Sequence, residues 1–304
     1  MNKKFRAYAG LILMTLIIGF SFLFVKMGQT CANSYDLLAH RFNAAFLAVL
    51  LLRALGLIKI EKTGRKEWLK IVGVSLFYPV MCFGFQTVGL EYASTSQAGI
   101  ILALLPILTL FAGALFLKEK TSVWQKAGIA VSVAGLIFLF ASGSNQSEGT
   151  SVAGTVLLLL SVVSMVVYYM IGKKLMQSHD SMTLTSIMVF SGFIIFNVLA
   201  VGRHAFLGTL SDYFKPLAHV NFLISIVYLG VLSSVLTSFL SNYALIHIST
   251  TQISVFNNLI PLIAIAAGVL LLGEHVSAAQ ITGGTAVLTG VVLVVGIGYK
   301  QRKQ

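Results

Sequence analysis

The sequence is poor in charged residues. Only 10% of its 304 residues are Asp, Glu, Lys or Arg, whereas 57% are hydrophobic and the mean hydropathy is +0.92. A water-soluble protein of this length needs far more charge to cover its surface. Apolar runs recur along the chain, and many reach the ~20 residues that a helix needs to cross a bilayer. The composition therefore predicts a polytopic, all-α integral membrane protein.

Several sequence signals are missing, and each absence excludes a class of protein. The sequence has no ten-residue segments in which polar and apolar residues alternate, so it does not indicate a membrane β-barrel. It also has no G-x-x-x-x-G-K-[ST] run, so it does not indicate an ATP-driven pump. The 9 acidic residues lie at the ends of apolar runs or in loops, whereas a proton-coupled carrier usually embeds an acid. The coupling ion is therefore left open: facilitated exchange and a proton carried by an end-of-span carboxylate both fit.

Cysteine and histidine are also sparse. The 2 cysteines are Cys31 in a connection and Cys82 inside an apolar run, so we expect packing roles and no disulfide. The 6 histidines are scattered, so we expect no metal site. No nucleophile has an evident base, and nothing suggests a cofactor. We therefore predict that the protein is not an enzyme and carries no cofactor.

The apolar runs predict ten spans. Lys3, Lys4 and Arg6 precede the first run, which is too long for the core of a signal peptide and is interpreted as a retained span. The spans are expected near 7–27, 35–56, 69–91, 94–117, 122–141, 152–172, 181–201, 220–245, 249–272 and 277–299.

Basic residues set the expected orientation. With the N-terminus inside, 17 of the 21 Lys and Arg residues lie in inner segments, which matches the positive-inside rule. We therefore predict a cell-membrane protein with both termini in the cytoplasm. The basic loops beside the spans are expected to attract anionic lipid rather than nucleic acid. Oligomeric state is left open, with a homodimer as one option.

The chain also repeats itself. A shift of 155 residues aligns 89–140 with 244–295 without a gap, and 15 of 52 positions are identical. Each half holds five expected spans. Because five is odd, the first half ends on the opposite side of the membrane, and the second half enters the membrane from that side. The sequence therefore predicts two inverted five-helix repeats, at 1–148 and 149–304, an architecture found in many secondary transporters.

Particular motifs resemble a known family. "SFLFVK" ends the first span, Arg41 lies early in the second, and a P…E…Q..G pattern occurs in each half (Pro106, Glu119, Gln125, Gly128; Pro261, Glu274, Gln280, Gly283). This pattern resembles the EamA-type branch of the drug/metabolite transporter superfamily. The resemblance implies a secondary transporter of small metabolites, such as amino acids, nucleosides or drug-like molecules. Export is the expected direction, and the alternatives are a channel-like facilitator and, less favoured, a membrane-embedded enzyme.

The repeat also separates candidate roles. Polar residues found in both halves are expected to serve the fold, whereas residues polar in one half suit an asymmetric substrate. Asn257 and Asn258 align with Leu102 and Ala103, so at least one asparagine is expected to face a central cavity; helix packing is the alternative. Helix kinks are expected at Pro79, Pro106 and Pro261.

Two groups of site residues follow. We expect the substrate cavity to be lined by Asn257 and Asn258 together with Tyr78, Gln86, Ser164, Tyr168, Tyr169, Tyr228, Ser234, Ser238 and Asn242. As a set, these side chains suggest an uncharged or zwitterionic substrate with an apolar or aromatic part. Charged residues near span ends are expected to form gating ion pairs, with static snorkelling as the alternative. These are Lys26, Arg41 and Glu274 at the outer face, and Glu119, Lys173 and Lys174 at the inner face.

Overall fold

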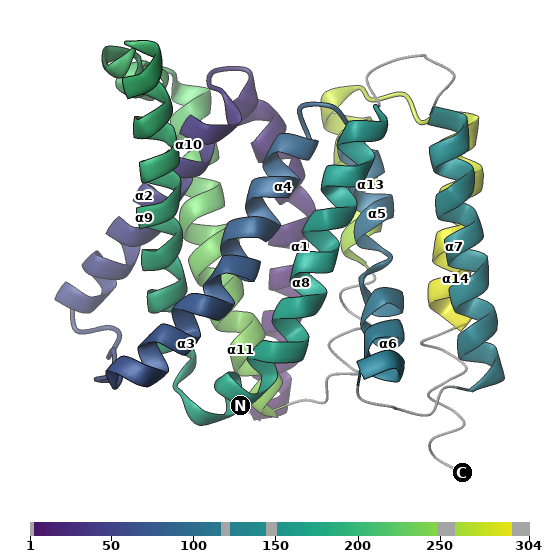
Figure 1. The fold of residues 1–304 in the computed structure, drawn as a ribbon, viewed down its shortest axis with the longest axis horizontal. Coiled ribbons are helices and arrows are strands. Elements are labelled where there is room, and N and C mark those ends of the chain that lie inside the picture. The colour runs from purple at the N-terminus through teal and green to yellow at the C-terminus, as the bar shows by residue number, and fades with distance from the viewer. Residues whose placement is uncertain (1–2, 117–121, 144–150, 248–258, 294–304) are drawn as a thin grey trace.

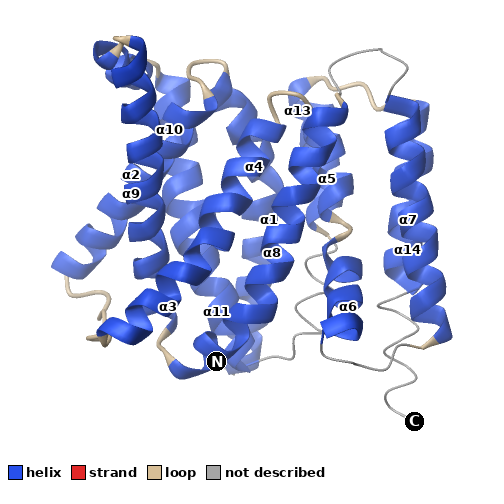
Figure 2. Ribbon diagram, viewed as in Figure 1, coloured by secondary structure: helices blue, strands red, loops and turns tan. Residues whose placement is uncertain are grey.

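A computed structural model describes residues 3–116, 122–143, 151–247 and 259–293, and within these ranges every regular element is a helix (Figures 1 and 2). The helices are α1 (Lys3–Gln29), α2 (Ser34–Ala54), α3 (Arg65–Ser75), η1 (Leu76–Met81), α4 (Cys82–Gly89), α5 (Thr95–Leu102), α6 (Leu105–Phe116), α7 (Val123–Gly143), α8 (Val152–Ser178), α9 (Ser181–Leu207), η2 (Leu210–Ala218), α10 (Val220–Val227), η3 (Tyr228–Leu236), α11 (Thr237–His247), α13 (Ile260–Leu272) and α14 (Ala278–Val292).

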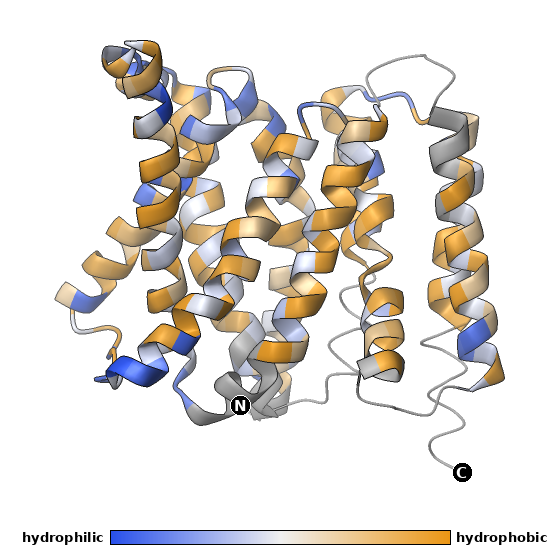
Figure 3. Ribbon diagram, in the orientation of Figure 1, coloured by the Kyte–Doolittle hydropathy of each residue, from blue (hydrophilic) through white to orange (hydrophobic). Residues whose placement is uncertain are grey.

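Many of these helices can cross a bilayer. In the described ranges, 7 helical stretches are long and apolar enough to do so, while α13 and α14 are shorter apolar helices. Hydrophobic residues cover the middle of the bundle, and hydrophilic residues gather toward the helix ends (Figure 3). The chain is therefore a multi-pass membrane protein. A count of ten spans stays a prediction, because the expected span at 249–272 lies partly outside the described residues.

Two spans change their helical pitch at matching positions. The stretch from α3 to α4 passes through the π-helical η1, and the stretch from α10 to α11 passes through the π-helical η3. A shift of 155 places Leu76–Met81 on 231–236, inside η3. Within η1, Tyr78 has extended dihedral angles (φ −141°, ψ 116°) and Pro79 follows it. The helix is therefore interrupted at Tyr78.

The two prolines shared by the repeat both begin a helix. The span that starts with α5 stops at Leu102 and resumes as α6 at Leu105, which puts Pro106 in the first turn of α6. Pro261 occupies the first turn of α13. Proline suits this position because a first-turn N–H has no partner within its own helix. Each proline therefore marks the start of a new helical segment.

Glycines bring α7 and α14 into close contact, and the two helices lie side by side at the right of Figure 1. A Cβ atom on Gly135 would lie 2.8 Å from the carbonyl oxygen of Gly283, and one on Gly290 would collide with the carbonyl oxygen of Gly128. Because 128 and 283 align under the 155-residue shift, as do 135 and 290, the two contacts are reciprocal. The helices run antiparallel and meet through small residues, which allow close backbone approach in membranes.

Other helix pairs match in the same way. Helix α1 packs against η3 and α11. Helix α8 packs against η1 and α4, which correspond to η3 and α11 under the 155-residue shift. Likewise α2 packs against η3, α9 packs against η1, and α2 and α9 pack against each other. The packing of each half therefore has a counterpart in the other.

Replacing Gly135 with alanine tests the close contact of α7 and α14. The new methyl group would lie 2.8 Å from Gly283 O and 2.9 Å from the Ala286 Cβ, so we expect a loss of about 1–3 kcal/mol of stability. The apparent melting temperature in detergent measures the effect. Gly73→Ala is the matched control, because nothing lies within 4 Å of its added Cβ. Equal melting temperatures for the two variants would contradict the close contact.

Candidate substrate cavity

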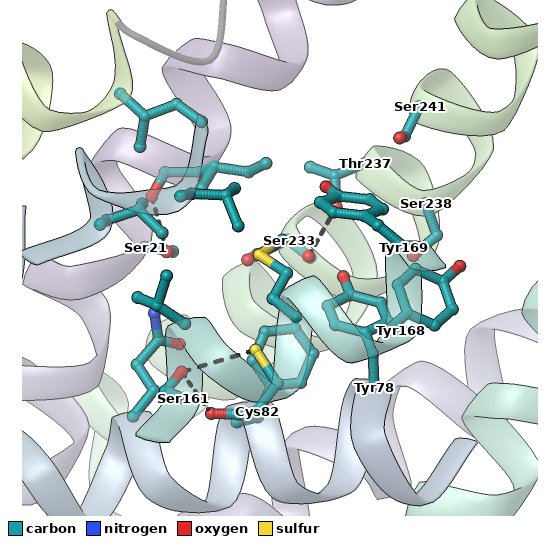
Figure 4. Close-up of a pocket in the computed structure, with 18 of the residues that line it drawn as sticks. Ser21, Tyr78, Cys82, Ser161, Tyr168, Tyr169, Ser233, Thr237, Ser238 and Ser241 are labelled. Carbon is teal, nitrogen blue, oxygen red and sulfur yellow. Dashed lines mark hydrogen bonds between the residues drawn. The ribbon is translucent and has the colours of Figure 1, made fainter. Parts of the chain in front are cut away.

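A cavity of about 80 Å³ lies among helices from both halves of the chain. It has room for a few water molecules and is small beside typical ligand pockets of ~300–1,000 Å³. Figure 4 shows the residues around it. Its lining consists of Met14, Ile18, Ser21, Tyr78, Cys82, Phe83, Gln86, Leu102, Leu105, Ser161, Val162, Met165, Tyr168, Tyr169, Met188, Ser233, Thr237, Ser238, Ser241 and Ile260.

Aromatic rings form one part of the lining. The ring centroids of Tyr78 and Tyr168 lie 4.9 Å apart, and those of Tyr168 and Tyr169 lie 5.6 Å apart. Phe83 extends the group, with its centroid 5.2 Å from that of Tyr78. Figure 4 shows the three tyrosines gathered on one side of the cavity. Such rings offer an apolar surface with a polar edge to a ligand.

Hydroxyl groups form a second part. Ser233, Thr237, Ser238 and Ser241 follow one another at helical spacing along η3 and α11. Under the 155-residue shift they correspond to Tyr78, Cys82, Phe83 and Gln86 on η1 and α4, which also line the cavity. One helical segment thus contributes hydroxyls at the positions where its counterpart contributes aromatic, thiol and amide groups.

Helix breaks also meet the cavity. Tyr78 leaves helical geometry, Leu102 ends α5, and Leu105 and Ile260 each begin a helix; all four residues line the cavity. In a bilayer, irregular backbone is tolerated where it faces protein or a water-filled space. The cavity therefore coincides with the interruptions of the helices.

Five of the predicted cavity residues line this space: Tyr78, Gln86, Tyr168, Tyr169 and Ser238. Three others do not line it, and each of their hydroxyls donates to a backbone carbonyl. The Ser164 hydroxyl donates to Leu160 O (2.8 Å), the Tyr228 hydroxyl donates to Ile17 O (2.9 Å), and the Ser234 hydroxyl donates to Leu229 O (2.8 Å). Asn257 and Asn258 lie outside the described residues, as does the side chain of Asn242.

Sequence reasoning missed several polar lining residues: Ser21, Cys82, Ser161, Ser233, Thr237 and Ser241. The sequence does carry a pattern for three of them, because Ser233, Thr237 and Ser241 recur every four residues and so lie on one face of a helix. Ser161 gives no such signal. Its hydroxyl donates to Cys82 O (2.8 Å), a contact between two helices that only the packing creates.

The lining carries no charged side chain. Among the described residues, no three His, Cys, Asp or Glu side chains cluster as metal ligands would. The cavity therefore offers rings, hydroxyls, one amide and one thiol, which suit binding rather than acid–base or metal chemistry.

A family model described as the EamA-like transporter family matches residues 5–141 and again 152–296. The chain belongs to the EamA-like transporter family. A relative from Bacillus subtilis (strain 168), described as "Uncharacterized transporter YcxC", is 40% identical over 291 residues, covering 96% of this chain and 93% of the relative. An "Uncharacterized transporter" from Archaeoglobus fulgidus is 26% identical over 281 residues, covering 91% and 94%.

A solved crystal structure shares the fold of this EamA-like chain. The two structures superpose with a TM-score of 0.64 at 17% sequence identity, and the match covers 97% of this chain and 98% of the chain in the solved structure. Family and relatives together identify a membrane transporter, which handles a small-molecule substrate in a lipid bilayer, and point away from an enzyme.

In this EamA-like transporter, polar residues shared by the two halves cap helices. Ser122 and Gln125 exchange hydrogen bonds between side chain and backbone at the start of α7 (2.8 and 3.3 Å), and Ser277 and Gln280 do the same at α14 (2.9 and 3.2 Å). These are capping boxes, which satisfy N–H groups that a helix start leaves unpaired. Ser94 caps α5 by accepting from Gln97 N (3.0 Å).

Glu274 also caps a helix. Its carboxylate accepts hydrogen bonds from Thr95 N (2.7 Å), Ser96 N (2.9 Å) and the Ser96 hydroxyl (2.8 Å) at the start of α5. An anion at a helix N-terminus meets both free N–H groups and the positive end of the helix dipole. The expected ion pair with Lys26 or Arg41 does not form among the described residues, where Glu274 binds backbone instead.

Arg41 lies apart from Glu274. Its side chain is buried, its Nε donates to the Ser234 hydroxyl (3.1 Å), and its guanidinium lies over the Phe83 ring, 3.8 Å from the centroid.

Glu119 lies outside the described residues, as do the side chains of Lys173 and Lys174. The expected inner cluster therefore stays a prediction.

Replacing Glu274 with alanine tests its capping role. We expect a loss of about 1–2 kcal/mol of stability, because two N–H groups at the start of α5 would lose their acceptor. The apparent melting temperature measures it, with Glu67→Ala as the control, since Glu67 only forms an exposed pair with Lys70. Unchanged stability with lost transport would instead favour a gate.

Proposed function

We propose that this transporter works by alternating access, with two inverted five-helix repeats at 1–148 and 149–304 moving around the cavity. The observation that carries the proposal is the pairing of lining residues. Both members of six pairs separated by 155 residues line the cavity: Met14 and Tyr169, Tyr78 and Ser233, Cys82 and Thr237, Phe83 and Ser238, Gln86 and Ser241, and Leu105 and Ile260. A site on the symmetry axis between two halves is equally reachable when either half moves.

The chemistry of the pairs indicates the kind of substrate. Five of the six pairs join unlike side chains, and only Leu105 and Ile260 are alike, so the cavity is symmetric in backbone but asymmetric in chemistry. Rings and methionines suit an apolar or aromatic part, while hydroxyls and Gln86 suit polar atoms. The substrate is therefore an uncharged or zwitterionic small molecule with an apolar part. Leu102, the aligned partner of Asn257, lines the cavity, which supports the prediction that Asn257 contributes to the site.

The orientation follows from the basic residues. Both termini lie in the cytoplasm, and the inner loops attract anionic lipid of the cell membrane. Export is the direction we propose. The small volume of about 80 Å³ supports a conformation that must widen before a metabolite enters.

Native cysteines provide a test of alternating access. Changing Cys31 to serine leaves Cys82 as the one cysteine of the chain, and Cys82 lines the cavity. We expect small, membrane-impermeant thiosulfonate reagents to modify Cys82 from the inside and, separately, from the outside of sealed vesicles. Mass spectrometry of the intact protein measures the extent of modification. Modification from one side alone would contradict alternating access, and fast modification from both sides at once would favour a channel.

Filling the cavity provides a second test. A thermal-shift screen of amino acids, nucleosides and drug-like amines first identifies a stabilising ligand. Thr237→Trp is then expected to abolish that stabilisation and reduce vesicle transport at least tenfold, because the indole occupies the cavity. Thr282→Trp is the control, since Thr282 is exposed and its hydroxyl bonds only to Ala278 O of its own helix. Unchanged transport by Thr237→Trp would place the substrate elsewhere.

A further inference from the structure

Arg41 is a cation buried inside the membrane-spanning bundle. It is 1% exposed, and it lies seven residues after Ser34, the first residue of α2, or about 10 Å along the helix. Charged residues at such depth are rare because hydrocarbon does not solvate them, and they usually mark a functional site. Arg41 is also remote from the inner segments that hold most of the basic residues.

The surroundings of Arg41 do not neutralise it. Its Nε donates to the Ser234 hydroxyl, while its Nη2 is buried and has no hydrogen-bond partner in the described part of the chain. No carboxylate among the described residues forms an ion pair with it. The Phe83 ring, 3.8 Å from the guanidinium, supplies a cation–π contact, which stabilises a cation less than an ion pair with good hydrogen bonds does.

The same contacts place Arg41 directly behind the cavity wall. Phe83 lines the cavity and covers the guanidinium, and Ser233, the neighbour of its partner Ser234, lines the cavity as well. A rotation of the Phe83 side chain away from the guanidinium would therefore uncover Arg41 toward the cavity. The free N–H groups of a guanidinium match the two oxygen atoms of a carboxylate.

We propose that Arg41 binds a carboxylate of the transported molecule, and that Phe83 covers Arg41 while the site is empty. This inference rests on the proposed function and names the chemical class of its substrate. A single guanidinium balances one negative charge, so within the uncharged or zwitterionic class proposed above it selects a zwitterion with one carboxylate, and it suits a phosphate dianion less well. The tyrosines and methionines of the cavity bind the apolar part of the same molecule.

The test compares a matched acid and amide on the purified full-length protein. 3-Phenylpropionate and 3-phenylpropionamide have the same shape and differ in charge at pH 7. We expect the acid to bind wild type at least tenfold more tightly in thermal-shift titrations, because a charge-assisted hydrogen-bond pair distinguishes them. Acetate, benzoate and L-phenylalanine extend the acid series.

Arg41→Met then separates binding from folding. A buried, unpaired charge replaced by an apolar side chain leaves stability equal or higher, so we expect the ligand-free melting temperature not to fall. The preference for the acid should disappear while amide binding persists. Arg41→Lys keeps the charge and is expected to retain a preference for the acid. The control is Arg53→Met, which removes an exposed arginine from the same helix.

Three results would overturn the role of Arg41. The first is equal binding of acid and amide by wild type, and the second is no stabilisation of wild type by any acid of the series. These two do not depend on whether a variant folds. The third is an acid preference that survives in Arg41→Met. None of the three affects the Cys82 modification test, so alternating access can stand while the role of Arg41 falls, and the reverse.

Discussion

The hydrogen bonds of the backbone constrain this protein more than any other interaction. A bilayer offers no partner for a free N–H or C=O group, so every break in a helix must face protein or water. The breaks at Tyr78 and between Leu102 and Leu105, together with the helix start at Ile260, meet at one cavity. The cavity of this EamA-like transporter therefore lies where its spans are interrupted.

A second constraint is close packing without a hydrophobic driving force. In lipid, helices associate through small residues that let backbones approach. The reciprocal contacts of Gly135 with Gly283 and of Gly290 with Gly128 join α7 to α14. Because this pair lies beside the bundle that holds the cavity (Figure 1), the cavity lining is free to differ between the halves. Packing residues repeat, whereas lining residues diverge.

Charge is used sparingly and for distinct purposes. Glu274 binds the N–H groups at the start of α5, which ties the end of α13 to that helix. Arg41 has no comparable anion among the described residues and lies against Phe83. One ion thus completes the hydrogen bonding of the fold, while the other has an Nη2 group without a hydrogen-bond partner among the described residues.

The sequence by itself determined the membrane class and the family, and it predicted that shared polar residues such as Ser277 and Gln280 serve the fold. Hydropathy depends on composition alone, and capping boxes such as Ser277 with Gln280 are local patterns that short-range geometry enforces. Tyr78, Gln86, Tyr168, Tyr169 and Ser238 were predictable in the cavity because their side chains differ from those at the aligned positions of the other half, as an asymmetric site requires.

Only the tertiary structure decided which polar side chains face the cavity and which bond to a neighbouring helix. Ser234 and Ser238 lie four residues apart, and from the sequence they were equivalent candidates. The packing of α2 presents Arg41 to Ser234, while Ser238 lines the cavity. The same packing directs Arg41 to Ser234 and Glu274 to the N–H groups of α5, so the expected ion pair between them does not form. Long-range contacts between helices set these choices, and no local pattern in the chain records them.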